Sequence, residues 1–328
     1  MHHFSFGRVA QSDGAPVSGP DFRPLDDVVY GRVDRVAPML RRVIAENPSK
    51  FTYRGTGTYI VGEGEVAVVD PGPMLDAHRD ALAAALAGER VAAICVTHCH
   101  SDHSPLAAWL GEATGAPTYA FGPHPLPDAD DEEELQEEIA EGVKVEETTD
   151  YAFRPDVPIA DGGVVASGPG WTITGVHTPG HTSNHMCFAF AEQGVLFPGD
   201  HVMGWSTTVV SPPDGDMAAY IESLRKVAGR PDRTYWPTHG PAIEAPQRYV
   251  EALVEHRLER ERQVLATVAA GVGQVADIVA VLYADVDEKL HKPAGRSVLA
   301  HLVKLVDEGA VRVADGDRPR LKSRYDAV

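Results

Sequence analysis

The sequence predicts an α/β fold, a sandwich of sheets and helices, followed by a small C-terminal domain. The 328 residues suffice for about two domains of ~150 residues each. Hydrophobic residues make up 43% and charged residues 23% of the chain, a globular balance that excludes a disordered or fibrous protein. The 31 glycines and 25 prolines disfavour an all-helical bundle, and strand patterns are followed by helix patterns along the chain.

The first part of the chain begins with an arm and continues with strands and helices. Residues 1–25 are rich in glycine, proline and serine and lack periodicity, so we expect a loose arm. The apolar run 91–96 is typical of a buried strand, and Ser104 with Pro105 predicts the start of a helix that ends near residue 114. Before residue 91, we expect two strands at 51–62 and 65–70, joined by a Gly-Glu-Gly turn, and then an alanine-rich helix at 76–89.

The middle of the chain combines an acidic segment with further strands. Residues 128–141 contain nine acidic residues and no basic residue, which is typical of a solvated surface insertion. The alternative is a lid that excludes anions. A helix is expected at 216–228, and strands are expected at 171–176, 186–190, 195–198 and 234–237.

The pattern changes near residue 246, where dense charges accompany a long helical stretch. Helices are expected at 247–270, 275–283 and 294–308. A hairpin with an Asp-Gly turn follows at 311–322, although Pro319 weakens its second strand. Three helices and a hairpin predict a winged-helix-like unit. We therefore expect a large domain at 1–255 and a small one at 256–328.

Composition and charge exclude several classes of protein. No apolar run reaches the ~18 residues needed to cross a bilayer, and no secretory signal is visible, so we expect a cytoplasmic protein without a membrane partner. Cys95, Cys99 and Cys187 offer no disulfide framework. The net charge is −19; residues 1–255 carry −20 and residues 256–328 carry +1, which disfavours nucleic acid as a partner.

A dense cluster of metal-binding residue types follows the buried strand at 91–96. The segment Thr97-His-Cys-His-Ser-Asp-His103 contains three histidines and one aspartate within six residues. Because residues two positions apart in an extended chain point the same way, His98 and His100 can converge on one ion. Asp102 and His103 lie where the chain turns and can face a second ion.

Three further segments place an imidazole or a carboxylate at the end of a predicted strand, namely those with His181, Asp200 and His239. Gly180 precedes the first of them, and we expect it to let the backbone pass close to a bound group. Sites in layered α/β folds form at such strand ends. Four separate segments therefore predict one shared metal site.

Together these motifs resemble the metallo-β-lactamase superfamily. The matching residues are His-x-His-x-Asp-His at 98–103, Gly-His at 180–181, Gly-Asp at 199–200 and His239. Residues 200–220, 256–261 and 299–309 are similar to the β-lactamase-like protein 2 subgroup, whose members carry a C-terminal winged-helix domain. The resemblance spans the chain from about residue 50 onward. It implies an αββα sandwich with a two-metal site, in which 1–255 form the catalytic domain.

The resemblance also assigns a role to each ligand. It implies that His98, His100 and His181 hold one metal, that Asp102, His103 and His239 hold a second, and that Asp200 bridges both. Nitrogen-rich ligation favours two Zn²⁺ ions, and the residue types also permit iron or manganese. Such a centre makes a metal-bridging hydroxide available at neutral pH, so we expect hydrolysis. Asp102 is the candidate catalytic residue, since it can orient the proton of the nucleophile.

Three other residues near these motifs need an interpretation. His185 either braces the ligand loop, or contacts substrate or protonates a leaving group. Asp70 either hydrogen-bonds a ligand histidine or simply ends a strand. Cys99 lies between two ligands but points away from them by strand alternation, so we expect it to pack in the interior.

Three functions compete. The first is a hydrolase acting on a small-molecule ester, thioester or lactone. The second is an endoribonuclease on single-stranded RNA, an activity linked to the subgroup, which would need a basic groove formed by Arg257, Arg260, Arg262, Arg296 and Lys304. The third is a non-enzymatic, ligand-sensing DNA-binding regulator. A tail that covers one edge of the pocket or packs a homodimer is the more ordinary interpretation of the C-terminal unit.

Overall fold

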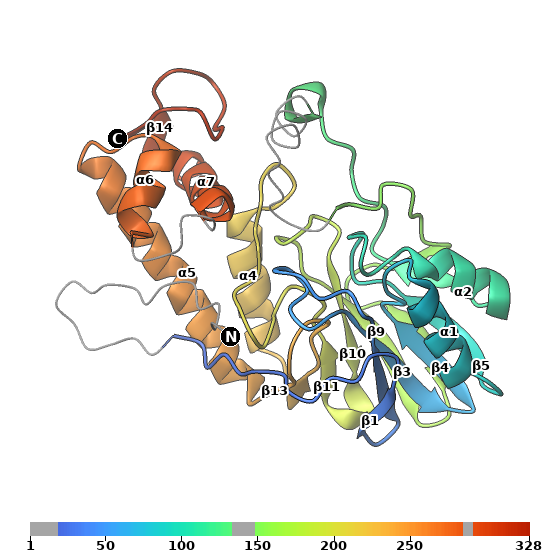
Figure 1. Cartoon of the computed structure of the whole chain (residues 1–328). Helices are drawn as coiled ribbons and strands as arrows, with labels where there is room; N and C mark the ends of the chain where they lie inside the picture. The colour runs from blue at the N-terminus through green and yellow to red at the C-terminus, as the bar shows by residue number, and fades with distance from the viewer. Residues whose placement is uncertain (1–18, 133–147, 285–290) are drawn as a thin grey trace.

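Two sheets pack face to face with helices on both outer faces, and a helical domain lies at one side (Figure 1). The structure is a computed structural model and describes residues 19–132, 148–284 and 291–328. The larger sheet has the order β1-β2-β3-β4-β5-β6-β7, and the smaller has the order β13-β12-β11-β10-β9-β8. These layers are the αββα sandwich that the sequence predicts.

Most neighbouring strands are antiparallel, and the pairs β4–β5, β5–β6, β6–β7 and β11–β12 are parallel. The larger sheet contains β1 (Val33–Ala37), β2 (Leu40–Ile44), β3 (Gly57–Glu63), β4 (Glu65–Val69), β5 (Arg90–Cys95), β6 (Thr118–Ala120) and β7 (Val157–Pro158). The smaller contains β8 (Val164–Gly168), β9 (Trp171–His177), β10 (Met186–Phe190), β11 (Val195–Phe197), β12 (Thr234–Tyr235) and β13 (Ile243–Glu244). A 3₁₀ turn (Ala191–Gln193) joins β10 to β11.

Alternation along the strands decides which side chains face which layer. In β4, Val66 and Val68 pack under α1 (Asp76–Ala85) and α2 (Leu106–Thr114), whereas Val69 faces the other sheet. In β10, Cys187 faces outward and Phe188 faces the space between the sheets. Period-two patterning therefore produces three stacked apolar cores from two sheets.

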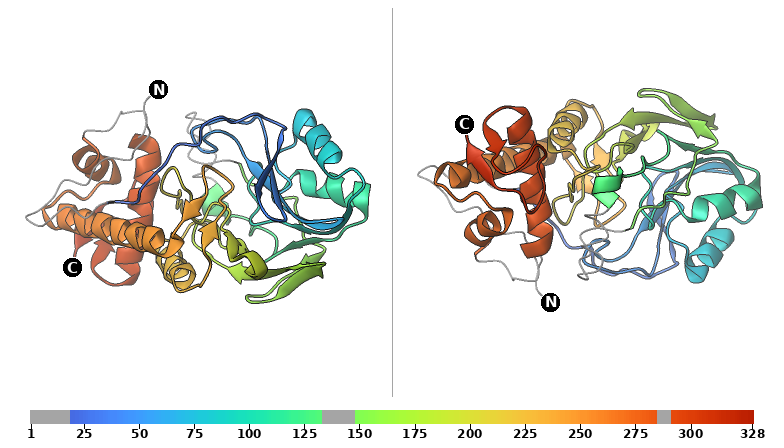
Figure 2. Two further views of the ribbon diagram at one scale, coloured as in Figure 1. Left: turned by 90° about the horizontal axis from the view of Figure 1, so that it is seen from below. Right: turned by 90° about the horizontal axis from the view of Figure 1, so that it is seen from above.

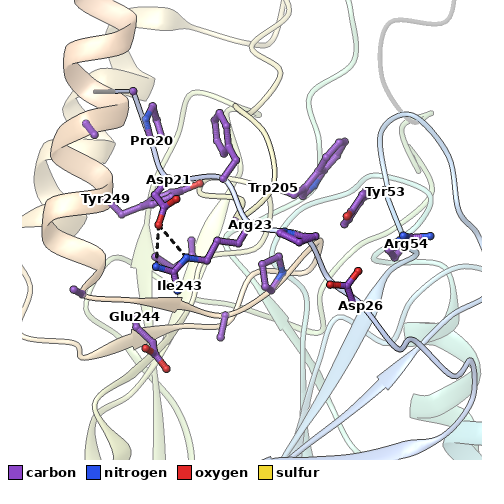
Figure 3. Close-up of a pocket in the computed structure, with 18 of the residues that line it drawn as sticks. Pro20, Asp21, Arg23, Asp26, Tyr53, Arg54, Trp205, Ile243, Glu244 and Tyr249 are labelled. Atoms are coloured by element: carbon purple, nitrogen blue, oxygen red, sulfur yellow. Dashed lines mark hydrogen bonds and ion pairs between the residues drawn. The ribbon is translucent and has the colours of Figure 1, made fainter. Parts of the chain in front are cut away.

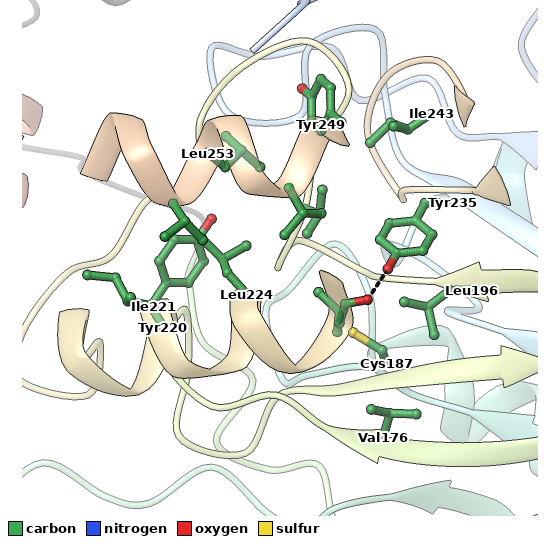
Figure 4. Packing of buried hydrophobic residues seen from close by; sticks show 14 of the residues in the cluster. Val176, Cys187, Leu196, Tyr220, Ile221, Leu224, Tyr235, Ile243, Tyr249 and Leu253 are labelled. Carbon is green, nitrogen blue, oxygen red and sulfur yellow. Dashed lines mark hydrogen bonds between the residues drawn. The ribbon is translucent and has the colours of Figure 1, made fainter. Parts of the chain in front are cut away.

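The outer face of the smaller sheet is covered by α4 (Met217–Ala228) and by the first half of α5 (Pro246–Ala269). Tyr220 and Leu224 of α4 and Leu253 of α5 meet side chains of the sheet there (Figure 4). The hydroxyl of Tyr235 donates a hydrogen bond of 2.7 Å to the carbonyl of Val227, so a buried polar group in this layer is satisfied.

The C-terminal domain contains α5, α6 (Val275–Leu282), α7 (His291–Asp307) and the hairpin β14 (Val311–Val313) and β15 (Tyr325–Ala327). It packs beside α4 (Figure 2). Helix α5 crosses the predicted division at residue 255 without a break. Leu253 belongs to the core of the sandwich and Val264 to that of the C-terminal domain, so we propose 255/256 as the division between two cores joined by one helix.

The hairpin prediction is wrong in its second strand. Residues 311–313 pair with 325–327, so the connection is a long loop and not a tight turn. Arg318 and Arg320 in this loop form ion pairs of 2.7–3.0 Å with Asp128, Asp130 and Asp131. The start of the acidic segment 128–141 is thus attached to the C-terminal domain, and residues 133–141 lie outside the described residues.

Two expectations for the N-terminal half also need correction. Residues 19–25, the described end of the predicted loose arm, are held in place: the amide of Arg23 donates to the carbonyl of Gly204, and Phe22 packs edge-on against Tyr249. Ser104 does not cap α2, because its hydroxyl donates instead to Asp150 at 2.7 Å. In the described ranges, no helix has both the length and the apolar character that a membrane span requires.

Candidate metal centre

All seven predicted ligands converge at one end of the sandwich, each on a loop that follows a strand. The β5–α2 loop carries His98, His100, Asp102 and His103, and the other three loops contribute His181, Asp200 and His239. All seven side chains are buried. Their ligand atoms form three overlapping groups, and the atoms within each group lie within 4.8 Å of one another: His98–His100–His181, His98–His103–Asp200 and Asp102–His103–His239.

The first group brings three nitrogen atoms to one point. Nδ1 of His100 lies 2.9 Å from Nε2 of His98 and 3.2 Å from Nε2 of His181. Two nitrogens bound tetrahedrally to one zinc at 2.0–2.1 Å are about 3.3 Å apart. The nitrogen atoms therefore have nearly the spacing that a shared cation requires.

The third group, Asp102–His103–His239, lies beside the carboxylate of Asp200. Oδ2 of Asp102 lies 3.3 Å from Nε2 of His103 and 3.1 Å from Nε2 of His239. Oδ1 of Asp200 lies 3.6 Å and 3.4 Å from the same two nitrogens. Since Asp200 also belongs to a group with His98, its carboxylate stands between the two sets of histidines.

Hydrogen bonds on the far side of the rings determine which nitrogen faces inward. Nδ1 of His181 lies 2.7 Å from the carbonyl oxygen of Val209, and Nδ1 of His239 lies 3.2 Å from that of Gly55. Because a carbonyl only accepts, each Nδ1 carries a hydrogen, which leaves Nε2 as the ring atom that can bind a cation. Nδ1 of His103 is 2.9 Å from the carboxylate of Asp70, with the same consequence.

Asp70 lies behind the metal centre and accepts hydrogen bonds from several residues around it. Its carboxylate accepts 2.8 Å hydrogen bonds from the amide and the hydroxyl of Thr97, and one of 3.1 Å from the hydroxyl of Thr238. Its φ of 49° is unusual for a residue other than glycine, and the four polar contacts hold it there. The interpretation of Asp70 as a residue that hydrogen-bonds a ligand histidine agrees with this geometry.

Burial and mutual charge divide the ligands into two electrostatic classes. Burial, together with neighbouring imidazoles, lowers the pKa of His98 and His100 well below the ordinary value. Burial opposes the charged form of His239 as well, but the carboxylates of Asp200 and Asp102 outweigh it and raise its pKa to about 10. Burial raises the pKa of Asp102, but His103 and His239 outweigh that effect and hold it far below its usual range.

The donor set fits a pair of divalent cations. Nε2 of His103 and Oδ1 of Asp200 are buried and have no hydrogen-bond partner among the described residues. Such orphaned atoms cost free energy unless a ligand satisfies them. Five imidazoles and two carboxylates are a borderline, nitrogen-rich set that suits zinc and also iron.

Three residues near the ligands have other tasks. His185 is fully buried behind His98, with its Nδ1 2.9 Å from the hydroxyl of Thr178, so its position supports bracing and not substrate contact. Cys99 packs in the core under α2, as expected. Gly180 has a φ of 135°, but it approaches α4 and not a bound group: a Cβ there would lie 2.3 Å from Cα of Tyr220.

The basic groove considered for RNA is absent from the described residues. The guanidinium groups of Arg257, Arg260 and Arg296 are buried. Arg262 pairs with Glu259, and Lys304 pairs with Glu261 and Glu308. These cations stabilise the C-terminal domain and its contact with the sandwich. Their spacing in the sequence therefore does not indicate an exposed basic groove.

Two threonines support the ligands in a way that the sequence does not reveal: Thr56 has no sequence signal, and Thr208 has the pattern of an ordinary loop hydroxyl near Asp200. The hydroxyl of Thr56 donates a 2.8 Å hydrogen bond to Asp102, and Thr208 donates to the carbonyl of Asp200 at 2.7 Å. Threonines are common in loops, and these two lie 46 and 8 residues from their partners. No local pattern distinguishes them, because only the folded chain brings them to the ligands.

Comparison with known proteins agrees with this geometry. Residues 53–239 match the metallo-beta-lactamase superfamily, and residues 275–318 match the beta-lactamase associated winged helix domain. The chain belongs to the metallo-beta-lactamase superfamily. The prediction of an enzyme of this superfamily with a C-terminal winged helix is thereby confirmed.

Two curated relatives resemble the chain over most of its length. An atrochrysone carboxyl ACP thioesterase from Aspergillus fumigatus is 31% identical, with 83% of each chain covered. A beta-lactamase-like protein 2 homolog from Drosophila melanogaster is also 31% identical, covering 86% of this chain and 92% of the relative. The second agrees with the subgroup that the sequence resembles.

Two solved structures share the whole architecture. A metallo-beta-lactamase family protein from Thermus thermophilus has a TM-score of 0.69 at 25% identity and covers 89% of this chain and all of its own. A beta-lactamase domain protein from Burkholderia ambifaria has a TM-score of 0.73 at 23% identity, covering 96% and 99%. In both cases the coverage exceeds the share of the chain formed by residues 1–255, so the shared fold extends beyond the sandwich.

Proposed function

We propose that the chain is a dinuclear metal-dependent hydrolase of acyl thioesters. The observation that carries the proposal is the group His98–His103–Asp200, which shares one histidine with each of the other two ligand groups and so places the carboxylate of Asp200 between them. Two divalent cations, which we expect to be Zn²⁺, would activate a water molecule near neutral pH and polarise the scissile carbonyl.

The residues of the chain contribute orientation and charge. His98, His100 and His181 would hold one cation, and Asp102, His103 and His239 the other. Asp102 is fixed by Thr56 and, with its low pKa, stays ionised at neutral pH. We propose that it also accepts a hydrogen bond from the nucleophile and so orients its proton, while the buried groups around Asp70 keep the ligand rings from turning.

A thioester is favoured over a lactone by the relatives and by the size of the adjoining groove. The relative from A. fumigatus is named a thioesterase. A groove of about 1520 Å³ is lined by Pro241 and Ala242, which follow His239, and by the stacked rings of Tyr53 and Trp205 (Figure 3), while none of the seven ligands lines it. Small-molecule pockets usually measure 300–1,000 Å³. The groove therefore has room for an acyl group joined to a long carrier arm.

The charges of the groove are mixed and form no purely basic surface. Its walls carry Arg23, Lys50, Arg54 and Arg248 together with Asp21, Asp26 and Glu244, and Arg23 is paired with Asp21 (Figure 3). A polyanion needs a continuous basic track to release its counterions. A mixed groove suits a carrier arm with separate polar and apolar parts. Nuclease activity stays the alternative, since the relative from D. melanogaster shares the subgroup.

The test is a substrate panel with zinc-loaded protein. It contains an acyl thioester of N-acetylcysteamine, the matching oxygen ester, a lactone and a single-stranded RNA oligomer. We expect the thioester to be hydrolysed fastest and His100→Ala to lose this activity. His78→Ala is the matched control, because His78 is also buried and bonded, at 2.9 Å to Thr58, but lies outside the ligand groups.

The panel has outcomes that contradict the proposal. RNA cleavage without thioester turnover would assign the centre to nuclease chemistry. Two bound zinc ions with no turnover in any class would leave the metal centre intact and remove the enzymatic assignment. Equal losses in His100→Ala and His78→Ala would show that the loss reflects instability and not the loss of a ligand.

A further inference from the structure

Arg257 of α5 is buried where the C-terminal domain meets the loop that follows Asp200. Its side chain is 4% exposed. Nη2 donates a hydrogen bond to the carbonyl oxygen of Thr208, and the guanidinium carbon lies 5.4 Å from the ring centroid of Tyr220. An arginine remains charged when buried and needs specific partners, so these contacts fix the position of the loop.

The backbone that Arg257 holds is directly connected to the metal centre. The hydroxyl of Thr208 donates to the carbonyl oxygens of Asp200, at 2.7 Å, and His201, at 3.1 Å. The next residue, Val209, offers the carbonyl that accepts from Nδ1 of His181 at 2.7 Å. Two consecutive residues therefore link ligands from two different loops.

A second arginine of the C-terminal domain holds the same loop a few residues further on. Nη1 of Arg296, on α7, donates a 2.7 Å hydrogen bond to the carbonyl of Pro212. The hydroxyl of Tyr220, whose ring lies under Arg257, donates to the carbonyl of His201 at 3.0 Å. Two helices of the C-terminal domain thus support one loop at two points.

We propose that Arg257 is a positioning residue of the metal centre and that the C-terminal domain acts through it to orient His181. This inference rests on the proposed function, because it requires His181 to bind a cation. Without the guanidinium, the buried carbonyl of Thr208 loses its donor, and the segment that presents the carbonyl of Val209 is free to shift. Loss of such an outer partner typically weakens metal binding about 10- to 100-fold.

Arg260 provides a matched control on the same helix, three residues further on. It is also 4% exposed. Its guanidinium carbon lies 4.4 Å from the ring centroid of Tyr283, and its Nη1 lies 3.4 Å from the carbonyl of Leu282, so it supports the interior of its own domain. Replacing either arginine removes one buried cation, but only Arg257 contacts the loop of the metal centre through Thr208.

The experiment compares Arg257→Met, Arg257→Lys and Arg260→Met with the full-length parent. Zinc affinity and stoichiometry are measured by competition with a chromophoric chelator, and the visible spectrum of the Co²⁺-loaded protein reports ligand geometry. We expect Arg257→Met to bind one of its two zinc ions about 10- to 100-fold more weakly, with an altered cobalt spectrum and a lower kcat at nearly unchanged KM. Arg257→Lys should recover part of the affinity, and Arg260→Met should keep it.

The possible outcomes separate this inference from the proposed function. Parental zinc affinity in Arg257→Met, or equal losses in both methionine variants, would overturn the positioning role. If a methionine variant fails to fold, Arg257→Gln and Arg260→Gln, which keep a polar head group, give the same comparison. A parent protein that binds two zinc ions but hydrolyses nothing would refute only the proposed function, since the zinc affinities still decide the role of Arg257. A parent that binds no zinc would overturn both.

Discussion

Replacing Asp70 by asparagine keeps the shape of the side chain but removes its charge, so it tests what the carboxylate contributes to metal binding and stability. The carboxylate accepts from Thr97 at 2.8 Å and from Nδ1 of His103 at 2.9 Å. An asparagine can still accept from one of these donors, but its amide nitrogen can only donate. Where that nitrogen faces His103, the ring must move its hydrogen to Nε2, and the lone pair that faces the metal centre is lost.

The expected effect follows from the loss of one outer partner. Metal affinity should fall about 10- to 100-fold, which corresponds to about 1.4–2.7 kcal/mol. The loss of hydrogen bonds to a charged acceptor should also lower the unfolding free energy of the metal-free protein by about 1.5–3 kcal/mol. Chelator competition measures the first quantity, and chemical unfolding in excess chelator measures the second.

Asp156→Asn is the matched control for this prediction. Asp156 accepts 2.8 Å hydrogen bonds from both the amide and the hydroxyl of Thr118, the same pair of donors that Thr97 offers Asp70. It holds β6 and no predicted ligand. Zinc affinity in Asp70→Asn that equals the parental value, or that falls no further than in Asp156→Asn, would refute the reasoning about the tautomer of His103.

Three further predictions follow from the metal centre and its supporting turns. Chelator treatment should abolish hydrolysis and lower Tm, and zinc at about 1,000 times its Kd should restore about 4 kcal/mol of unfolding free energy. A Tm that does not change when zinc is added would contradict this prediction. Zinc binding at neutral pH should release about two protons, because the carboxylates raise the pKa values of His103 and His239 and both rings must lose a proton to bind. Calorimetry in buffers of different ionisation enthalpy measures the number of protons released. A value of zero is incompatible with this ligand set. Gly180→Ala should lower the free energy of unfolding by about 3 kcal/mol or more, because its Cβ would meet the backbone of Tyr220 at 2.3 Å. Gly64 has a φ of 73° and open space around it, so Gly64→Ala should lower the free energy of unfolding by about 1–2 kcal/mol. Equal Tm shifts in the two variants would contradict the steric argument.

The local chemistry of the centre could be predicted from the sequence because ligands of this kind are concentrated in short motifs. Four of the seven ligands lie within residues 98–103, and the others follow apolar runs that are recognisable as strands. The apolar run 91–96 similarly predicts a buried strand, which the structure forms as β5. These features depend on periods of two residues and on strand ends, both of which are encoded locally.

The tertiary structure alone decided which groups support those ligands. The carbonyl of Gly55 meets His239 across 184 residues, and Asp70 meets Thr238 across 168. The same holds for Arg257: its sequence neighbourhood is dense in charge and predicts a surface groove, yet the fold buries it against Thr208. A backbone carbonyl or a single arginine has no sequence signature, because its hydrogen-bond partner depends on how distant segments pack and not on its neighbours along the chain.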